Sequence, residues 1–576
     1  MNYRRKKEKE DLTKGSWDRT AHMKLKREKE HELEWKNLTI GKALKEASKK
    51  WGNKEAIASK NKRLSYSELF DVACKLATGL DKLGIKKGDS VGTIFGGVLE
   101  WVYAKYALNI IGAKIVPINV NFKKREIEFV LRQADVKVLI TTDKLRYGKY
   151  LEILSEVDPE IALAKEKKIQ STVLPSLEKI ICFSPEKNTY PYCYDYYQVM
   201  DSGSDYKEAT VDCLLDQVKP DDICNILFTS GSTAFPKGAM HCHTSLLGIG
   251  ASLFGKTFNL NSSHKLLCFL PFYHIAGCVY YILGALSVGC SVHVNEFAPD
   301  EILPIIQDDK ISLYGGFDAH FNAISDHPKF KDFDLSSVKF VLLATGPEWY
   351  DRCQKIFPKL EKIAHHYGFT EGTGVSVPPN ETDYKVRKFT NGKPWPGIET
   401  KVVDPSTGQR VPPNEGGELC LRGWSRFQGY YKAPEETKQA IDSEGYFHSG
   451  DYGWMDEEGN VVYRGRYKMM IKSGGENISE REVEVLLEEL SGVKSVQVIG
   501  VPDKKWGETV TAVIEVEEGV SLIQDDVIEF CRDKMARFKV PKNVLFINGN
   551  NWPLLGAGKV NKIKLKEWAV SKLKSS

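Results

Sequence analysis

The sequence lacks several features that would place it in a special class of protein. Its 576 residues include 12 scattered cysteines but no Cys-x-x-Cys pair, so free thiols in a reducing compartment are the simplest interpretation. No run approaches the roughly 20 apolar residues that span a bilayer, and no signal peptide with an apolar core begins the chain. We therefore expect a cytoplasmic protein without an integral membrane segment.

An excess of one charge is also missing. The formal net charge is only +4, and nucleic-acid binding needs a concentrated basic face, so we expect no nucleic-acid partner. Residues 1–35 differ from the rest because they are dense in Lys, Arg and Glu. We interpret them as a charged, solvated or partly helical extension. A membrane-surface or partner-docking arm is the alternative, which the mixed charge weakens.

The length and the apolar pattern favour two to four domains of α/β type. Ser65 to Glu68 form a capping box, and apolar residues then recur at helical spacing until Gly84 ends the helix. A strand at 91–95, a helix at 99–111 and a strand at 115–118 follow. This order of strand, helix and strand is typical of parallel sheets that are covered by helices.

The pattern changes near residues 465–470. Downstream, a helix at 480–490, strands at 493–501 and 510–516 and a helix at 522–535 predict a smaller α+β unit. We therefore divide the chain into the extension (1–35), a large N-terminal domain (36–466) and a C-terminal domain (467–576). The hinge between these two domains is expected at 467–469.

A hydroxyl-rich loop follows the strand that is expected at 225–228. It reads Thr229-Ser230-Gly231-Ser232-Thr233-Ala234-Phe235-Pro236-Lys237-Gly238. Hydroxyls, glycine amides and one lysine are the donors that a polyphosphate requires. No Gly-Lys-Ser/Thr closes the loop, which argues against an ordinary P-loop NTPase. The loop alone is equally compatible with a surface turn.

Five further motifs follow in order along the chain. They are Tyr367-Gly368-Phe369-Thr370-Glu371, Tyr446-Phe447-His448-Ser449-Gly450-Asp451, Gly465-Arg466-Tyr467-Lys468, Ser473-Gly474-Gly475-Glu476-Asn477-Ile478 and Pro553-Leu554-Leu555-Gly556-Ala557-Gly558-Lys559. Together with the loop they resemble the adenylate-forming superfamily of acyl-CoA synthetases, firefly-type luciferases and peptide-synthetase adenylation domains. The resemblance covers roughly residues 36–570. The chain departs from the family at Ala234, where a second glycine is usual, and at Ser449, where Thr is commoner.

The resemblance implies a fold, a reaction and a set of site residues. The fold is α/β, with a large N-terminal adenylation domain of several subdomains and parallel-rich sheets, and a small mobile α+β C-terminal domain. ATP and coenzyme A are the implied co-substrates and Mg²⁺ is the implied metal, held by Glu371. The implied catalytic residues are Lys559, Glu371, Thr233, Lys237 and His274. The implied ATP and AMP contacts are Thr229, Ser230, Gly231, Ser232, Gly238, Gly346, Pro347, Tyr367, Gly368, Thr370, Asp451 and Arg466. Ser473, Gly474 and Gly475 are implied beside coenzyme A, and Lys468 is the implied pivot.

The same resemblance points to the acyl pocket, through Tyr273, Gly277, Gly315, Gly316, Phe317 and Thr345. These residues are mostly small or apolar, so we expect an acid with an uncharged tail. Acetate-specific relatives carry Trp where this chain has Gly368, so we expect an acid larger than propionate: medium-chain, alicyclic or aromatic. Asp318 is the exception, since a charge in the pocket would select a polar substrate unless Asp318 faces solvent or caps a helix.

We therefore expect an AMP-forming carboxylic acid:CoA ligase whose partners are a small acid, ATP and coenzyme A. The alternative is an enzyme that passes its acyl-adenylate to a carrier protein, although amino-acid-activating domains place Asp where this chain has His274. A luciferase-type oxygenase and a non-catalytic scaffold are further alternatives. His241-Cys242-His243 suggests metal ligands, but on the helix expected there residues i and i+2 do not share a face. The oligomeric state stays open, with a homodimer as one candidate.

Overall fold

The computed structural model describes residues 35–164, 166–229, 236–344, 346–376, 381, 383–467, 470–473, 476–503, 506–532, 534–535, 537–555 and 559–575. These residues belong to two compact units. The first holds the described residues up to Ala298 together with Asp308–Leu313 and Phe427–Pro434. The second holds Pro299–Gln307, Tyr314–Arg426 and the described residues from Glu435 onward.

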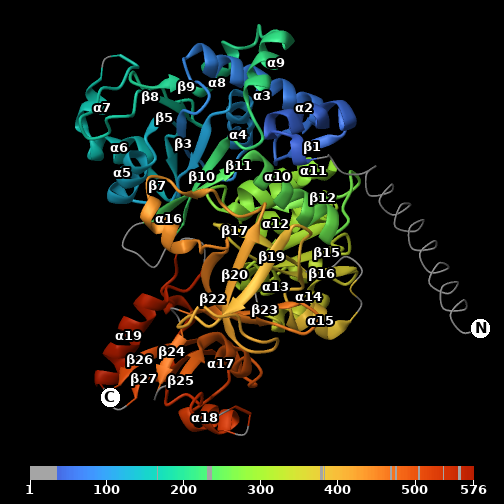
Figure 1. Ribbon diagram of the computed structural model, residues 1–576, viewed down its shortest axis with the longest axis vertical. Helices are drawn as coiled ribbons and strands as arrows, with labels where there is room; N and C mark the ends of the chain where they lie inside the picture. Colours follow the sequence, from blue (N-terminus) through green and yellow to red (C-terminus); the bar gives the residue numbers. More distant parts are fainter. Residues whose placement is uncertain are drawn as a thin grey trace, which may run out of the picture. The chain divides into compact units, whose positions relative to one another are not determined.

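An eight-stranded sheet forms the centre of the first unit (Figure 1). Its order is β21 (Gly429–Tyr430), β11 (Lys237–Cys242), β10 (Ile223–Thr229), β4 (Lys114–Pro117), β3 (Ser90–Ile94), β5 (Val136–Thr142), β8 (Lys179–Phe183) and β9 (Tyr194–Asp195). The strands from β10 to β9 pair in parallel. By contrast, β11 pairs antiparallel with β10 and with β21. The sheet is thus parallel in its body and antiparallel at one edge.

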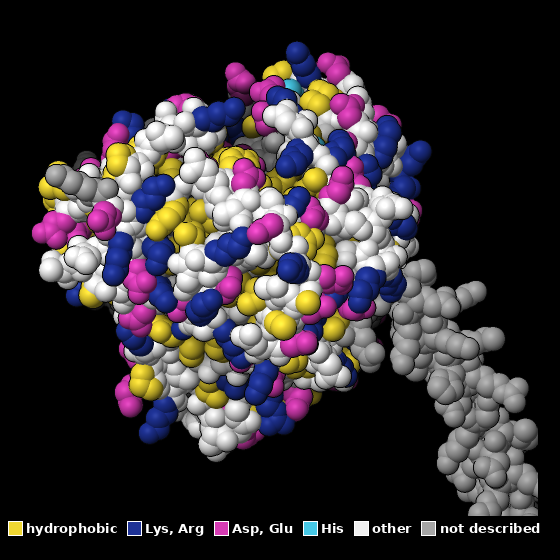
Figure 2. Space-filling view, turned by 90° about the horizontal axis from the view of Figure 1, so that it is seen from above, with side chains coloured by type: hydrophobic (Ala, Val, Ile, Leu, Met, Phe, Trp, Pro, Cys, Tyr) yellow, Lys and Arg dark blue, Asp and Glu magenta, His cyan; other side chains and the backbone are white. Residues whose placement is uncertain are grey.

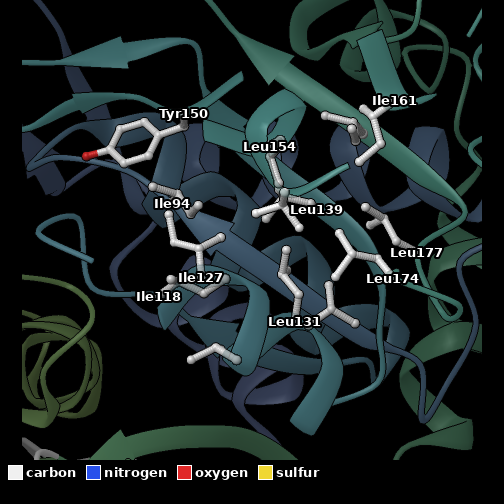
Figure 3. Close-up of a cluster of buried hydrophobic side chains, with 14 of the residues drawn as sticks. Ile94, Ile118, Ile127, Leu131, Leu139, Tyr150, Leu154, Ile161, Leu174 and Leu177 are labelled. Carbon is white, nitrogen blue, oxygen red and sulfur yellow. The ribbon is translucent and has the colours of Figure 1, made fainter. Parts of the chain in front are cut away.

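Helices cover the sheet and bury their apolar side chains against it. On one face, side chains of α5 (Lys124–Gln133), α6 (Tyr150–Val157) and α7 (Pro159–Leu163) pack on β3, β4 and β5 in one apolar cluster (Figure 3). The other helices of this unit are α2 (Ile40–Trp51), α3 (Tyr66–Lys82), α4 (Leu99–Ile111), α8 (Tyr196–Asp201), α9 (Glu208–Gln217), α10 (His243–Gly250) and α11 (Ile282–Val288). Two π-helices flank the segment that contains His274: η2 (Ala251–Thr257) precedes it, and η3 (Ala276–Tyr281) follows it. In α4 every residue except Glu100 is buried.

A second set of strands completes the first unit. β1 (Glu55–Ala58) and β12 (Lys265–Cys268) both pair in parallel with β13 (Ser291–Val294), and β2 (Arg63–Ser65) pairs antiparallel with β1. The short strands β6 (Lys144–Leu145) and β7 (Gly148–Lys149) form a separate hairpin.

The second unit begins with the run β14 (Leu313–Gly316), β15 (Phe340–Leu343), β16 (Lys362–Phe369), β17 (Gly372–Ser376) and β18 (Lys393–Pro394). Its helices in this part are α12 (Pro299–Asp308), α13 (Asp318–Ser325), α14 (Glu348–Ile356), α15 (Tyr384–Phe389) and α16 (Pro434–Ala440). An antiparallel sheet of β19 (Ile398–Val403), β20 (Gly417–Gly423), β22 (Phe447–Met455) and β23 (Val461–Arg466) follows. This sheet carries two of the residues that are expected to hold AMP.

The last part of the second unit is a small sheet with helices on both faces. β24 (Met470–Ser473), β25 (Glu476–Ser479), β26 (Val493–Asp503), β27 (Gly507–Val516) and β28 (Asn543–Phe546) form the sheet. One cluster joins it to α17 (Glu480–Leu487) and α18 (Gln524–Arg532), and another joins it to α19 (Lys562–Ser575). This confirms a small C-terminal α+β unit.

The structure confirms several local predictions and corrects others. Ser65 and Glu68 form both bonds of the capping box, and Gly84 and Gly112 have the positive φ that ends a helix. Residues 237–242 continue as a strand because they pair along β10, so the helix expected at His241-Cys242 is wrong and α10 begins only at His243. No helix in the described ranges is long and apolar enough to cross a membrane.

The face in Figure 2 shows Lys and Arg side chains interspersed with Asp and Glu side chains, with hydrophobic side chains between them. On this face no extended surface of one sign is present. That distribution agrees with the small formal net charge of +4.

Candidate active site

Asp451 and Arg466 face each other across the antiparallel strands β22 and β23. They are register partners, and Nε of Arg466 lies 2.8 Å from Oδ1 of Asp451. The hydroxyl of Tyr367, on β16, donates a hydrogen bond to Oδ2 of Asp451 at 2.8 Å. Three residues that are distant in sequence and expected to hold AMP therefore share one cluster in the second unit.

Burial controls the charge of this cluster. It raises the pKa of Asp451 to about 6, although Arg466 and the Tyr367 hydroxyl act in the opposite direction. The Glu371 carboxylate, in the turn between β16 and β17, raises it further by repulsion. Burial opposes the charge of Arg466, but the carboxylates of Asp451 and Glu371 outweigh it and raise the Arg466 pKa. Glu371 therefore acts on both members of the pair.

Glu418 fixes the backbone that carries Asp451. Its Oε1 accepts a hydrogen bond from the amide of Gly450 at 2.8 Å, and its Oε2 lies 2.8 Å from Nδ1 of His448. Gly450 has a φ of +69°, the left-handed region that glycine adopts without strain. The Ser449 hydroxyl accepts from the amide of Asp451 at 3.0 Å. Sequence reasoning missed Glu418, because only strand pairing brings β20 beside β22.

The same neighbourhood contains the one group of three potential metal-ligand side chains found within the described residues. The ligand atoms of Glu418, Cys420 and His448 lie within 4.8 Å of one another. Glu418 and His448 are already bonded to each other, and the hydrogen bond to Glu418 raises the pKa of His448. We therefore interpret the group as a hydrogen-bonded support for Asp451. His241 and His243 do not belong to it, and burial lowers the pKa of His243 to about 3.

Lys559 lies against a residue that is expected to line the acyl pocket. Its Nζ is 4.4 Å from the centroid of the Phe317 ring. The backbone on each side of Lys559 is fixed, because its carbonyl accepts from the amide of Leu555 at 2.7 Å and the amide of Asn561 donates to the carbonyl of Pro553 at 2.6 Å. The side chain of Lys559 is exposed.

Three residues later, the half-buried Lys562 forms two ion pairs. Its Nζ lies 2.6 Å from a carboxylate oxygen of Glu480 and 2.6 Å from one of Glu484, both on α17. Arg481 forms ion pairs with Glu484 and, across to α14, with Glu348. The network joins the start of α19, just after Lys559, to α17 and α14 within the second unit.

Gly346 and Pro347 lie immediately before α14, close to this network. A Cβ built at Gly346 would overlap the side chains of Arg481 and Glu348, so close packing explains the glycine. Thr345, which is expected in the acyl pocket, lies outside the described residues. The structure therefore places Gly346 against Arg481, and the AMP contacts of Gly346 and Pro347 stay predictions.

The acyl-pocket residues of β14 lie in the same unit. Gly315 and Gly316 are buried in the strand, and Phe317 follows them. The amide of Phe317 donates to Nδ1 of His320 at 3.1 Å, and burial lowers the pKa of His320 to about 4, so that ring is a neutral acceptor. Asp318 is the first residue of α13, one position after the N-cap residue Phe317, and its side chain lies outside the described part of the structure.

Gly368 and Thr370 belong to the strand end that carries Tyr367. Gly368 is exposed, whereas its neighbours Tyr367 and Phe369 are buried, as the alternation of a strand requires. Thr370 is half-buried beside Glu371. Gly368 is thus the exposed position near the end of β16, on the face that also carries the half-buried His366.

In the first unit, the hairpin β10–β11 holds the two ends of the hydroxyl-rich loop. Thr229 is the register partner of Lys237, and Phe228 is the partner of Gly238. Nζ of Lys237 lies 5.3 Å from the centroid of the Tyr430 ring. Ser230, Gly231, Ser232 and Thr233 lie outside the described residues. The pairing of β10 with β11 thus places Thr229 and Lys237 opposite each other on neighbouring strands.

Tyr273, His274 and Gly277 also belong to the first unit. The Tyr273 hydroxyl accepts from Asn121 at 3.3 Å, and burial raises the pKa of Tyr273 to about 12. His274 is exposed, and its Nδ1 accepts from the amide of Ala276 at 3.2 Å. A Cβ at Gly277 would overlap the carbonyl oxygens of Leu270 and Pro271, so this glycine is required for backbone packing.

The residues expected beside coenzyme A and at the hinge are only partly described. Ser473 is buried at the end of β24. Gly474, Gly475 and Lys468 lie outside the described residues. The hinge, the domain limits and the coenzyme A contacts therefore stay predictions.

The donors around Glu371 fit a magnesium ion. Mg²⁺ takes oxygen ligands, keeps several waters and is usually held by one or two carboxylates together with substrate phosphates. Glu371 is a half-buried carboxylate in a turn, so it can reach a hydrated ion. Asp451 is engaged by Arg466 and Tyr367 and is a poorer ligand.

Comparisons with known proteins agree with this arrangement. A family model described as AMP-binding enzyme matches residues 44–431, and one described as AMP-binding enzyme C-terminal domain matches residues 482–559. The chain is 32% identical to an acyl-CoA synthetase, YngI, of Bacillus subtilis (strain 168), over 92% of this chain and 96% of that protein. It is 30% identical to a methyl-dioxo-octahydroindenyl propanoyl:CoA ligase of Rhodococcus jostii (strain RHA1), over 92% of this chain and 98% of that protein.

Two further similarities concern a cow enzyme and a solved structure. The chain is 29% identical to the mitochondrial medium-chain acyl-CoA ligase ACSF2 of Bos taurus, over 93% of this chain and 88% of that protein. The crystal structure of the anthranilate CoA ligase AuaEII in complex with anthranoyl-AMP superposes with a TM-score of 0.80 at 22% identity, over 93% of this chain and 98% of that chain. At this identity the structural likeness supports the fold alone. The family match and the relatives together establish that the chain belongs to the AMP-binding enzyme family and is an acyl-CoA synthetase.

Proposed function

We propose that this enzyme activates a medium-chain, alicyclic or aromatic carboxylic acid with ATP and transfers the acyl group from its adenylate to coenzyme A. The observation that carries the proposal is the cluster of Asp451, Arg466, Tyr367 and Glu371 in the unit that also holds Lys559 against Phe317. This cluster offers a ribose acceptor, a cation and a carboxylate for a hydrated ion. These groups suit a reaction that depends on positioning and charge.

The first half-reaction joins two anions. A carboxylate oxygen attacks the α-phosphorus of ATP, and pyrophosphate leaves with the electrons of the broken P–O bond. We assign to Lys559 the stabilisation of the negative charge that develops at the α-phosphate and the carboxylate. Mg²⁺ held by Glu371 would supply further neutralisation of phosphate charge. The leaving pyrophosphate is held, in this proposal, by residues of the hydroxyl-rich loop: Lys237, Thr233, Ser232, Thr229, Ser230, Gly231 and Gly238.

We assign the binding of the nucleoside part of ATP to residues of the second unit. The Asp451 carboxylate accepts hydrogen bonds from the ribose hydroxyls, and Arg466 keeps that carboxylate ionised. Tyr367 orients Asp451 through its hydroxyl and offers a ring face to the adenine. Gly346, Pro347, Gly368 and Thr370 complete the assigned AMP contacts.

In the second half-reaction the thiol of coenzyme A attacks the acyl carbonyl, AMP leaves with the electrons of the cleaved bond, and the thiol proton passes to solvent. We assign His274, exposed at the start of the segment before η3, to the neighbourhood of the thiol. The loop Ser473-Gly474-Gly475 is assigned to coenzyme A, with Lys468 as the pivot between domains 36–466 and 467–576. Removal of Lys559 by rotation would make room for the thiol.

The substrate class rests on the acyl-pocket residues Tyr273, Gly277, Gly315, Gly316, Phe317 and Thr345 together with Gly368. Gly368 leaves an exposed position near the end of β16 without a side chain. Two relatives are named for a medium-chain acid and for an alicyclic propanoyl group, which supports an acid larger than propionate. Burial of such a tail contributes about 0.8 kcal/mol per CH₂.

The experiment is a screen of pyrophosphate release over straight-chain acids from acetate to dodecanoate and over alicyclic, aromatic and amino acids, each with and without coenzyme A. We expect acyl-CoA from the larger uncharged acids. Release that depends on an amino acid, is unchanged by coenzyme A and loads a phosphopantetheinyl carrier protein would establish the carrier-protein function instead.

A further inference from the structure

Lys105, on the buried helix α4, is an unusual residue in the interior of the first unit. Its side chain is 1% exposed, and its Nζ is fully buried without a hydrogen-bond partner among the described residues. A buried amine without a partner costs free energy whether it is charged or neutral. An apolar side chain of similar length would avoid this cost, so the presence of lysine here requires a reason.

Among the residues that the structure describes, no carboxylate acts as a counter-charge on Lys105. Its Nζ lies 5.6 Å from the Trp101 ring. Burial lowers the pKa of Lys105, and the groups that act in the other direction are the thiols of Cys278 and Cys224. Burial raises the pKa of Cys278 to about 11 and that of Cys224 further still, so both thiols are neutral at physiological pH. The described groups that act on this amine are thus the two neutral thiols and the ring of His243, which is uncharged because burial lowers its pKa to about 3.

This amine adjoins the segment that we assign to the acyl group. The ring of Trp101 stacks on Phe272, with centroids 4.2 Å apart and planes 10° from parallel. Phe272 directly precedes Tyr273, and Cys278 directly follows Gly277. Lys105 therefore neighbours the acyl segment at both ends, through Trp101 at one and through Cys278 at the other.

The backbone at the far end of this segment is also irregular. Cys278 lies in the π-helix η3, and π-helical turns occur frequently at functional sites. The hydroxyl of Tyr281, in the same helix, is buried without a hydrogen-bond partner among the described residues. Tyr281 packs edge-on against Phe254 of η2, where the Ser252 hydroxyl is likewise buried and unpartnered. Two buried hydroxyls without a hydrogen-bond partner among the described residues thus lie in η3 and in the π-helix packed against it.

We propose that Lys105 recognises an uncharged oxygen acceptor on the distal part of the acid, such as an oxo group or a hydroxyl. The inference rests on the proposed function and narrows its substrate class to acids whose hydrophobic tail carries oxygen. An oxygen bound to Nζ restores the hydrogen bond that the folded protein lacks. An unsubstituted tail leaves the amine unpaired and gains only the burial of its CH₂ groups.

The test compares three eight-carbon acids: octanoate, 7-oxooctanoate and 7-hydroxyoctanoate. We would measure kcat/KM for acyl-CoA formation with the wild-type enzyme, with Lys105→Met and with Lys105→Gln. We expect the wild type to prefer an oxygen-bearing acid over octanoate by about 10- to 100-fold, the scale of one hydrogen bond to a buried donor. Lys105→Met should lose that preference, and Lys105→Gln, which keeps a donor, should retain part of it.

Two controls separate selectivity from folding. Lys362→Met makes the same change at another largely buried lysine, at the start of β16 in the second unit, where burial lowers the lysine pKa to about 8; it should leave the selectivity ratio unchanged. The Tm of ligand-free Lys105→Met should equal or exceed that of the wild type, because the substitution removes an unpaired buried amine. A Tm well below wild type would show that Lys105 has a structural partner and would overturn the proposal.

The outcomes distinguish this inference from the proposed function. Acyl-CoA formation in which wild type and Lys105→Met share one preference for octanoate would overturn the role of Lys105 and leave the proposed function intact. An absence of CoA-dependent AMP release for every acid of the wider screen would overturn the proposed function itself.

Discussion

The ammonium group of Lys559 lies 4.4 Å from the centroid of the Phe317 ring. A cation over an aromatic face at an exposed site gains only about 0.5–1 kcal/mol, so this contact orients the lysine without trapping it. The backbone bonds of Lys559 to Leu555 and of Asn561 to Pro553 hold the loop itself. A lysine held in this way can exchange the ring for a phosphate or carboxylate oxygen at little cost.

Replacement of Lys559 should separate the two half-reactions. Lys559→Ala is expected to slow acyl-AMP formation by about 10²–10³-fold, the effect of removing one preorganised charge donor. Thioester formation from supplied acyl-adenylate should continue at nearly the wild-type rate. Rapid-quench measurement of both steps tests this, with exposed Lys564→Ala as the matched control. An equal loss in both steps would refute the assigned role.

Nucleotide affinity should depend on pH through Asp451. Its folded-state pKa of about 6 lies above the ordinary value of 3.8, so the carboxylate that accepts ribose hydroxyls is lost as pH falls through 6. AMP binding, measured by calorimetry, should weaken over that interval, and Asp451→Asn should bind weakly without the same pH dependence. Stability has the opposite sign: ionisation of buried Asp451 destabilises the protein as pH rises from about 4 to 6. An AMP affinity that is constant from pH 5 to 7 would contradict the assignment.

Substitution of Gly368 by a large side chain should restrict the enzyme to shorter acids. The glycine is exposed near the end of β16, and its neighbours Tyr367 and Phe369 are buried on the other face, so Gly368→Trp places an indole there without disturbing either aromatic ring. We expect activity on six- to eight-carbon acids to be lost and activity on acetate or propionate to be spared. The comparison of kcat/KM across the series is the measurement. A wild-type enzyme that already prefers acetate would show that the pocket is not built as proposed.

Lys562 should be important for the stability of the part that carries Lys559. Lys562→Met leaves Glu480 and Glu484 buried without their cation, which should destabilise the C-terminal part by about 3–5 kcal/mol. Lys562→Arg should recover much of this because it keeps the charge. Burial already raises the pKa of Glu480 from its ordinary value of 4.5 to about 7. Ionisation of Glu480 therefore lowers the stability of the folded protein as the pH rises from about 4.5 to about 7. Denaturant unfolding at several pH values measures both effects; equal midpoints for the two variants would argue against the ion-pair network.

The sequence predicts the elements of this protein better than their contacts. Ser65, Gly84 and Gly112 have local signals, so their helices begin or end where expected. The strand at His241 was missed because its partner, β10, determines its conformation rather than its own residues. Glu418 and Lys105 have no motif, and their positions become informative only when the fold brings β20 beside β22 and α4 beneath the acyl segment.

The most direct test of the central account is the product balance of one reaction in the presence of an accepted acid, ATP and coenzyme A. We predict equal amounts of AMP, pyrophosphate and acyl-CoA, with acyl-AMP accumulating up to one equivalent per enzyme when coenzyme A is omitted. Formation of ADP and inorganic phosphate, or AMP release without any thioester when coenzyme A is present, would contradict it.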